Sequence, residues 1–445
     1  MILKKLGFGL TGLIIVASIY YFASGSTQLT SKIKAQVDSE LANIQTQGFS
    51  IQGRVLNKEK EHFIISLDEP QKLATFFTEN GIQLSAADAE ILKGLKVGVD
   101  LQYLPDAYSA VTIDMYPMAL PAAMIEVAQT KEDKKILTQI EKMLKKKIFL
   151  MHFAVNKIGT GFKGYIKDID ETIQGDENIK MLLSKLEFSG DIKDNKIEGM
   201  KQTLKELGID VGNKFTMTMH DLKSDYKMTG ATQYDYIANY SIEKMTTKAD
   251  DELNVLLNDF ELSSDSTVKD GLSSGVLKTK TKNIIIDKKG GKLILNNIVF
   301  EMKAANLDMK AFEQLDQIDV ENEKEINMVL QQLISQGISF EIPTFSIDNI
   351  ENLGQKMGGF SLTSMFKIDK SLNVVATKNN PLTAVNALNA KIDFSLSKEL
   401  FSELAKRPEA VMAMMLFQPK DINGKKIYKI ELKDGKLSVN GKQAM

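Results

Sequence analysis

The residue types that most often bind metals or perform catalysis are sparse in this chain. Its histidines are His62, His152 and His220, each alone within a segment predicted as a strand, and it contains no cysteine. Zinc sites need clustered ligands at defined spacing, and a lone imidazole is more often a surface or interface residue. The lack of cysteine also excludes disulfides and thiol catalysis. The sequence therefore predicts no metal site.

Carboxylates and serines also fall short of a catalytic pattern. Acidic clusters at 168–171 and 250–252 do not follow the spacing of a calcium-binding EF-hand loop, and such clusters are far more often solvated turns. Serines near 273 and 361 lack the G-x-S-x-G pattern of a hydrolase nucleophile. The glycine pair at 290–291 fits a hairpin turn rather than a phosphate-binding loop. The sequence therefore predicts no catalytic residue, no cofactor and no enzymatic activity.

The composition indicates a folded protein without a nucleic-acid partner. The 445 residues suffice for two or three ordinary domains or for one elongated domain. Apolar residues make up 43% of the chain, enough to form a core and to exclude global disorder. The 56 basic and 58 acidic residues are interspersed, so no basic face for nucleic acid is indicated.

An uncharged stretch at residues 6–23 follows Lys4 and Lys5. As a helix it would be roughly 27 Å long, close to the ~30 Å hydrocarbon core of a bilayer. The two lysines favour a cytoplasmic N-terminus, which places the remaining chain across the bacterial inner membrane, in the periplasm. The residues predicted to form this transmembrane anchor are Leu6, Leu10, Leu13, Ile14, Ile15, Val16, Ile19, Tyr20, Tyr21 and Phe22.

A cleaved signal peptide is the alternative for this stretch. A basic start, an apolar run and the small residues at 23–26 fit that alternative as well. The apolar run is longer than usual for a signal peptide, two tyrosines stand near its end, and no lipobox cysteine follows. These features favour an uncleaved anchor.

Alternation of apolar and polar residues predicts the fold class. Most segments after residue 148 alternate with one apolar and one polar side, which is typical of antiparallel sheet with one face packed and one face solvated. Asp434-Gly435 between two alternating runs is a strong hairpin signal. Pro343 interrupts a strand and suggests an edge or a bulge. We expect an α+β, β-dominated fold: one N-terminal transmembrane helix and an elongated, mostly antiparallel sheet with helices covering one face or end.

Helices are expected mainly before residue 150. Pro121 is predicted to start one long helix that reaches about Lys147, and Ser85 to cap another. Short helical segments are predicted at 180–183 and 204–207, and a strand at 372–376. Segments near 304–317 and 389–406 repeat a strand, a polar turn and a helix. The expected organisation is a cytoplasmic stub and signal-anchor at 1–25, a mixed helix and strand region at 26–147, and an extended antiparallel β-rich region at 148–445.

Two segments rich in alanine and methionine, 119–128 and 410–417, are the most distinctive apolar features after the anchor. Methionine is flexible, and methionine-rich surfaces suit variable apolar ligands. Burial in a core is the commoner role for such residues and is favoured here, and a lipid-facing groove or a membrane-contacting patch is the alternative. The candidate apolar patch consists of Met412, Met414, Met415, Leu416 and Phe417.

The collinear order of several segments resembles the YdgA-like proteins of bacterial envelopes. After the N-terminal anchor come LNDFELSSDSTVKDGLSSGVLKTKTKNIII (257–286) and GGKLILNNIVFEMKAANLDMKAFEQL (290–315). GISFEIPTFSI, LNAKIDFSLSKELFSEL and the closing YKIELKDGKLSVNGK follow in the same order. The region before about 250 matches only in outline. The resemblance implies an inner-membrane protein that faces the periplasm, and it supplies no catalytic residue.

Three hypotheses for the function remain open. The first is a membrane-anchored envelope protein that binds or shields lipid or another apolar component. The second is a structural or interaction scaffold that presents its sheet to envelope proteins and takes no small ligand. The third is an enzyme acting on cell wall or lipid, for which no constellation of residues is visible. The expected partners are the inner membrane and lipid or envelope proteins.

Overall fold

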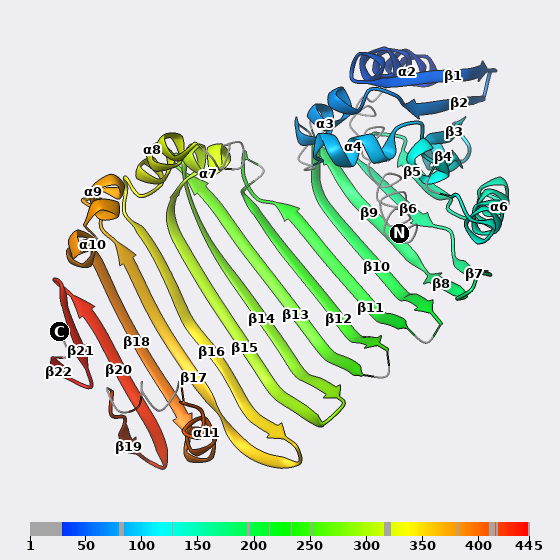
Figure 1. Cartoon of the computed structure of the whole chain (residues 1–445). Coiled ribbons are helices and arrows are strands. Elements are labelled where there is room, and N and C mark those ends of the chain that lie inside the picture. The colour runs from blue at the N-terminus through cyan, green and yellow to red at the C-terminus, as the bar shows by residue number, and fades with distance from the viewer. Residues whose placement is uncertain are drawn as a thin grey trace. The chain divides into compact units, whose positions relative to one another are not determined.

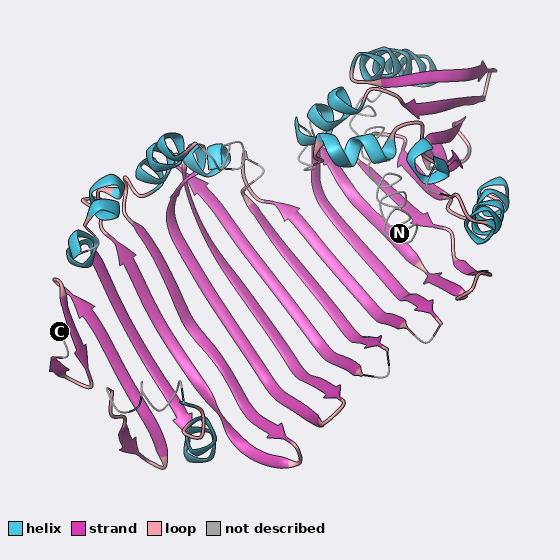
Figure 2. Ribbon diagram, in the orientation of Figure 1, coloured by secondary structure: helices cyan, strands magenta, loops and turns pink. Residues whose placement is uncertain are grey.

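The computed structural model describes residues 29–79, 84–126, 128–193, 196–212, 214–232, 234–250, 252–315, 322–380, 382–408, 414 and 417–443. The chain divides into two compact units, Met1–Asp225 and Tyr226–Met445, and each is built on antiparallel sheet (Figures 1 and 2). The predicted β-dominated, antiparallel fold is confirmed. The anchor expected at 6–23 lies outside the described residues, and no described helix is both long and apolar enough to cross a bilayer.

The described residues of unit 1 join five helices to one antiparallel sheet. Its helices are α2 (Leu29–Thr46), α3 (Pro70–Glu79), α4 (Ala86–Leu92), α5 (Ala122–Glu126) and α6 (Lys131–Lys145). Its strands are β1 (Phe49–Leu56), β2 (Lys60–Leu67), β3 (Lys96–Tyr103), β4 (Ser109–Ala119), β5 (Met151–Asn156), β6 (Gly161–Ile166), β7 (Ile169–Ile173), β8 (Ile179–Ser184), β9 (Leu186–Lys193) and β10 (Lys196–Val211), and β11 (Phe215–Met228) crosses the unit boundary. Strands β1 to β6 pair consecutively, β9 follows β6, and β10 pairs with both β9 and β8. The sequence-based boundary at 147 falls inside this unit, where β4 pairs with β5.

The helices of unit 1 close a single core over one face of this sheet. Phe63 and Ile65 of β2 and Val99 of β3 have no solvent exposure, because alternate residues of each strand point to the same side. Leu73 of α3 and Ile140 of α6 belong to the same buried cluster. Unit 1 therefore packs as an ordinary two-layer domain.

A charge network around the buried Glu61 ties α2 to the hairpin β1–β2. The Glu61 side chain has no solvent exposure and accepts hydrogen bonds from Arg54 Nε and Tyr103 Oη, both at 2.6 Å. Arg54 also pairs with Asp38 of α2. Burial and the hydrogen bond to Glu61 raise the pKa of the Tyr103 phenol. The network satisfies a carboxylate that would otherwise be costly to bury.

Unit 2 is a meander of long strands. Its strands are β12 (Tyr236–Ala249), β13 (Leu253–Lys269), β14 (Leu272–Lys288), β15 (Gly291–Asp308), β16 (Ile338–Asn352), β17 (Gln355–Ile368), β18 (Leu388–Ser397), β19 (Lys420–Ile422), β20 (Lys425–Lys433), β21 (Lys436–Val439) and β22 (Lys442–Gln443). Its helices are α7 (Met309–Leu315), α8 (Glu323–Leu333), α9 (Val374–Asn379), α10 (Leu382–Ala387) and α11 (Lys398–Leu404). Neighbouring strands pair antiparallel from β12 through β18, and β20 follows β18. Helices α7 to α10 lie at one end of these strands and α11 at the other (Figure 1).

Several local predictions are confirmed. Lys433 pairs with Lys436 across the predicted Asp434-Gly435 turn. Strand β16 lies between two neighbours, so it is not an edge, but its register shifts between Ile342 and Phe345 as expected of a bulge at Pro343. Ser85 caps α4 by accepting from the amide of Asp88. The repeated strand and helix appear as β15 with α7 and as β18 with α11.

Other local predictions are wrong. Residues 180–183 and 204–207 were expected to be helical but belong to β8 and β10, which pair with each other. The expected strand at 372–376 instead leads into α9, and the single long helix after Pro121 is two helices, α5 and α6. Short apolar runs fit helix and strand equally well, and pairing with a neighbour decides between them.

We predict that Arg54→Ala lowers the free energy of unfolding by about 2–3 kcal/mol, because it leaves the buried Glu61 carboxylate without its cation. Urea unfolding of the full chain followed by circular dichroism measures this change. Lys72→Ala is the matched control, since it removes an exposed pair with Glu69 that should contribute less than ~0.5 kcal/mol. Equal effects of the two substitutions would contradict the role assigned to the network.

Candidate functional site

The two faces of the unit 2 sheet differ in chemistry. On one face, Ser263, Lys278, Glu301 and Thr344 are cross-strand neighbours from β13 to β16. Lys278 Nζ lies 3.8 Å from Glu301 Oε1, and Lys303 Nζ lies 3.7 Å from the same oxygen. This polar face carries the polar residues of the alternating pattern, which the sequence predicts to face solvent.

The opposite face, which we call the apolar face, carries continuous rows of apolar side chains. Residues in direct cross-strand register point to the same side of a sheet, so each row can be followed from strand to strand. One row consists of Ile242, Phe260, Ile298, Ile347, Phe360 and Leu396, with Thr281 between Phe260 and Ile298. The next consists of Tyr240, Leu262, Phe300, Phe345, Leu362, Phe394 and Tyr428, with Thr279 between Leu262 and Phe300.

Aromatic rings from these two rows form a continuous path across five strands. Phe345 stands edge-to-face against Phe300 and Phe360, with ring centroids 5.7 and 5.0 Å apart. Phe360 meets Phe394 at 5.9 Å, and Phe394 stacks on Tyr428 at 6.4 Å. Such contacts fix the rings relative to one another. The path gives the apolar face a firm surface from β15 to β20.

A third row extends the apolar face toward the turns between β12 and β13 and between β14 and β15. Leu257, Ile284, Leu295 and Ile350 are in direct register. Ile350 packs against the cluster of Leu396, Leu400 and Tyr428, which includes two members of the apolar rows, so this row lies on the apolar face as well. Asp259 and Asn297 have a left-handed backbone (φ 48° and 51°) and lie between the third row and the first row. There they interrupt the strict alternation of side chains along β13 and β15.

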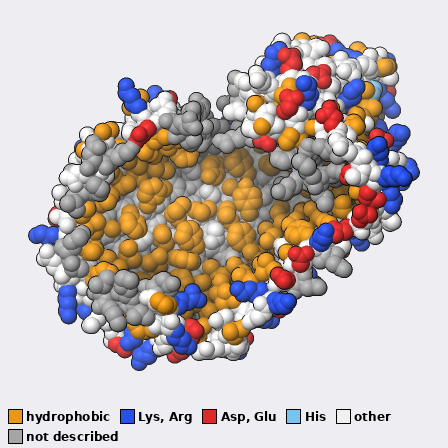
Figure 3. All heavy atoms as spheres, in the orientation of Figure 1, with side chains coloured by type: hydrophobic (Ala, Val, Ile, Leu, Met, Phe, Trp, Pro, Cys, Tyr) orange, Lys and Arg blue, Asp and Glu red, His pale blue; other side chains and the backbone are white. Residues whose placement is uncertain are grey.

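The described helices cover the apolar face only at its margins. Leu400, Phe401 and Leu404 of α11 pack onto it near β17, β18 and β20. Among the described residues, the buried cluster of unit 2 consists of Leu396, Leu400 and Tyr428. Most members of the apolar rows are only half-buried. Figure 3 shows the result as a hollow lined by hydrophobic side chains over β12 to β18, with charged side chains at its rim. Contiguous apolar surfaces of this extent commonly mark interaction sites, so the apolar face is the candidate functional site.

The candidate apolar patch of the sequence is only partly described. Met412, Met415 and Leu416 lie outside the described residues, and Met414 is half-buried. Phe417 packs against the cluster of Leu396, Leu400 and Tyr428 at the margin of the apolar face. The other methionine-rich segment, 119–128, contains Met124 of α5. The Met124 side chain is 1% exposed and lies in the interior of unit 1. The apolar rows of unit 2 were not predicted as a binding site, although the sequence shows the one-sided alternation of apolar and polar residues along their strands.

The structure brings two of the three lone histidines into one polar row of unit 1. His62, Asp100, Asp114, His152 and Tyr165 are direct cross-strand neighbours from β2 to β6. His62 Nδ1 lies 2.7 Å from Asp100 Oδ1 and His152 Nδ1 lies 2.6 Å from Asp114 Oδ1. The third, His220, lies 3.9 Å from Glu206.

This row is a charge-compensated ladder. Two carboxylates directly opposite each other destabilise a strand pair unless cations offset them. Lys147 Nζ lies 2.9 Å from Asp100 Oδ2 and rests 3.7 Å from the centre of the Tyr116 ring. Burial alone would raise the pKa of the Asp100 carboxyl, but hydrogen bonds from Lys147 and His62 outweigh burial and hold that pKa below its usual value. Among the described residues, no group of three or more His, Asp or Glu side chains could hold a metal ion. We therefore interpret the ladder as a set of ion pairs that stabilises the sheet.

Comparison of the chain with protein-family models, with curated protein sequences and with solved structures found no match. The resemblance to YdgA-like envelope proteins therefore stays a prediction from the sequence.

We predict that Asp100→Asn lowers the free energy of unfolding by about 0.5–1 kcal/mol near neutral pH, a modest value because the side chain is 38% exposed. The pKa of Asp100 is lower in the folded chain than in the unfolded chain. The stabilisation that the Asp100 carboxylate gives to the fold is therefore complete above the unfolded-state pKa, and it is lost as the pH falls through the folded-state pKa. The difference from the unsubstituted chain should therefore be constant above about pH 5 and shrink toward pH 3.

Urea unfolding at a series of pH values measures this difference. Asp170→Asn is the control, since Asp170 is 72% exposed and 3.8 Å from Lys180, and it should change little at any pH. A pH-independent effect of Asp100→Asn would contradict the assigned electrostatic role.

Proposed function

We propose that this chain is a membrane-anchored protein of the bacterial envelope that binds lipid acyl chains on the apolar face of unit 2. The observation that carries the proposal is the continuity of the apolar rows from β12 to β18, without a described layer over their middle. The uncharged N-terminal stretch supports the bacterial inner membrane as its location, with the N-terminus cytoplasmic and the bulk in the periplasm. The lack of cysteine is compatible with an oxidising compartment.

The dimensions of the apolar face suit acyl chains. Neighbouring strands lie ≈ 4.8 Å apart, so the rows from β12 to β18 extend over roughly 29 Å. The acyl chains of one bilayer leaflet fill only about half of the ~30 Å hydrocarbon core. A row thus offers more than the length of one acyl chain in continuous apolar contact.

The chemistry of the apolar face suits a ligand without a fixed polar pattern. Its rows contain aromatic and branched aliphatic side chains, interrupted by the hydroxyls of Thr279 and Thr281. Such a surface gains free energy from apolar burial, at about 25 cal/mol per Å², without requiring one exact ligand geometry.

We predict that phospholipid co-purifies with the full-length chain and is reduced at least about tenfold by Phe345→Asp. A carboxylate at the centre of the aromatic path removes apolar contact and must itself be desolvated when acyl chains bind. Native mass spectrometry and lipid extraction of protein purified in mild detergent measure the bound lipid.

Ser346→Asp is the matched control, because it introduces the same charge at the next residue of β16, on the polar face. Thermal unfolding of both variants checks that the fold is retained. Equal amounts of bound lipid in the unsubstituted chain and in both variants would show adventitious binding and contradict the proposal. A full-length chain free of lipid would favour the scaffold without a small ligand.

A further inference from the structure

Three hairpin tips of unit 1 lie side by side at one end of its sheet. They are the turns between β1 and β2, between β3 and β4, and between β5 and β6. The Tyr103 amide donates to the Glu59 carbonyl at 2.8 Å, and the Lys157 amide donates to the Tyr108 carbonyl at 3.0 Å. Backbone hydrogen bonds therefore join each tip to the next. We call the three together the tip edge, which consists of residues 55–60, 104–108 and 157–160.

The tip edge concentrates the exposed apolar side chains of unit 1. Eight large apolar side chains are exposed among the described residues of this unit, and five of them stand on the tip edge. Their exposed fractions lie between 45% and 83%, and they are Val55, Leu56, Leu104, Tyr108 and Ile158. Single exposed apolar residues are normal on a protein surface, whereas a contiguous group commonly marks an interaction site.

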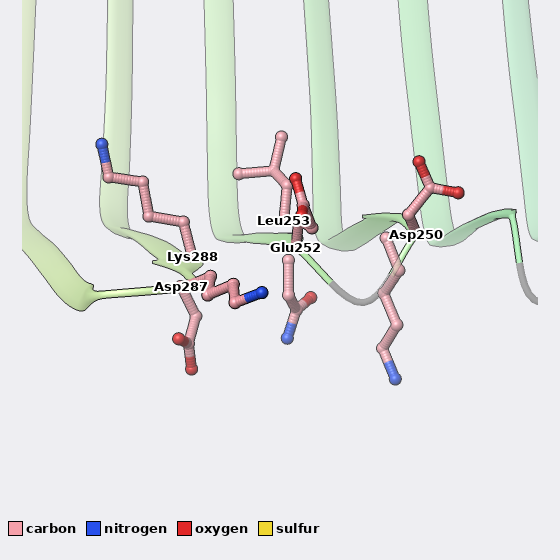
Figure 4. Close-up of a pocket in the computed structure, with 8 residues that line it drawn as sticks. Asp250, Glu252, Leu253, Asp287 and Lys288 are labelled. Carbon is pink, nitrogen blue, oxygen red and sulfur yellow. The ribbon is translucent and has the colours of Figure 1, made fainter.

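Turns between the long strands of unit 2 have a different composition. At the turns between β12 and β13 and between β14 and β15 lies a crevice, and six of its eight described lining residues are charged. Figure 4 shows its one apolar residue, Leu253, pointing back along the strands, whereas Asp287 points beyond their ends. The turn between β16 and β17 exposes a single large apolar residue, Leu353. Because solvated turns are ordinarily polar, the apolar side chains of the tip edge call for a separate explanation.

Lysines accompany the apolar side chains of the tip edge. Its exposed charged residues are Lys58, Glu59, Lys60, Asp106 and Lys157. Asp106 is engaged within its own turn, where Oδ1 accepts from the amides of Tyr108 and Ser109, both at 2.7 Å. A lysine stem can lie along apolar surroundings while its ammonium group stays hydrated, and tyrosine favours the interface between lipid and water. Apolar side chains with lysine and tyrosine are typical of segments that lie in the headgroup region of a bilayer.

Helix α2 begins at the tip edge. Lys34 lies in its second turn, and Lys34 Nζ donates to the carbonyl oxygens of Asn57 and Lys58 at 3.1 and 2.9 Å. One turn later, Asp38 pairs with Arg54 of β1, which lies further from the tip. The helix therefore runs away from the tip edge, and its first residues are the nearest to it.

The predicted anchor stands just ahead of this helix in the sequence. Only residues 24–28 separate the uncharged stretch at 6–23 from Leu29, the first residue of α2. A segment of that length spans at most roughly 20 Å. An anchor in the bilayer therefore keeps the tip edge close to the membrane surface, and this proximity favours lipid over a protein partner as the occupant of the tip edge.

We propose that the tip edge of unit 1 inserts into the headgroup region of the bilayer that holds the anchor. This inference rests on the membrane anchor of the proposed function and is independent of acyl-chain binding by unit 2. The five exposed apolar side chains would leave water at the level where headgroups meet acyl chains, and the lysines would lie among the lipid phosphates. Unit 1 would then be held at two points, the anchor and the tip edge, which would fix its orientation on the membrane.

The test is fluorescence quenching by lipid, which the lack of cysteine in the chain makes direct. Tyr108→Cys or Ile158→Cys places a single nitrobenzoxadiazole probe on the tip edge of the full-length chain. Each labelled protein is reconstituted in nanodiscs of dioleoyl phosphatidylethanolamine and dioleoyl phosphatidylglycerol. Adding a phospholipid with a nitroxide near the glycerol end of its acyl chain should quench both probes at least about twofold, because the tips reach that depth.

Ile125→Cys is the matched control, because the Ile125 side chain is likewise exposed, at 52%. Ile125 lies in α5, which follows β4, whereas the tip between β3 and β4 precedes that strand. Strand β4 is eleven residues long, or roughly 35 Å, so the control probe stands at the far end of the sheet. It should be quenched little.

Equal quenching at positions 108, 158 and 125, or none at 108 and 158, would overturn insertion of the tip edge, and the second result would favour a protein partner as its occupant. Loss of the full-length chain from the nanodiscs would overturn the anchor and this inference together. Acyl-chain binding by unit 2 is decided separately, by the lipid that co-purifies with the Phe345→Asp variant. The failures of the two proposals are therefore distinguishable.

Discussion

The structure of unit 2 depends on the burial of one face of a single antiparallel sheet. Alternation along the strands forces every second side chain to the same side, and in this unit that side is apolar over seven neighbouring strands. Water contact with such a surface is unfavourable in proportion to its area. Helix α11 relieves this at one margin only. Acyl chains are the occupant that would complete the burial without adding a protein layer.

Unit 1 shows how the same alternation behaves when the chain supplies its own second layer. Helices α2, α3, α4 and α6 contribute to one buried cluster with the strands, and residues such as Phe63 and Met115 lose all solvent exposure. Its buried Glu61 carboxylate is paired with Arg54 and Tyr103, and Asp100 and Asp114 are paired with His62 and His152. Unit 1 therefore closes its own core, whereas the described residues of unit 2 leave the packing on the apolar face incomplete.

The sequence predicted the class of fold from local pattern, and its misses follow from non-local pairing. The alternation after residue 148, the Asp434-Gly435 turn and the bulge at Pro343 depend on neighbouring residues and were predictable. The assignment of 180–183 to β8 depends on pairing with residues 207–210 of β10, which stand more than twenty positions later in the chain. The aromatic path likewise joins Phe300, Phe345, Phe360 and Phe394 only through register. The histidines looked isolated because Asp100 and Asp114 reach them across strands.

The most direct test of the account is site-specific photo-crosslinking in cells that produce the full-length chain. A benzophenone side chain is placed at position 345 on the apolar face or at position 346 on the polar face of β16. After irradiation, mass spectrometry of the purified protein identifies what each probe has captured. Binding of acyl chains to the apolar face predicts adducts of phospholipid mass at position 345 and none at position 346. Protein-sized adducts at position 345, or lipid captured equally at both positions, would contradict it.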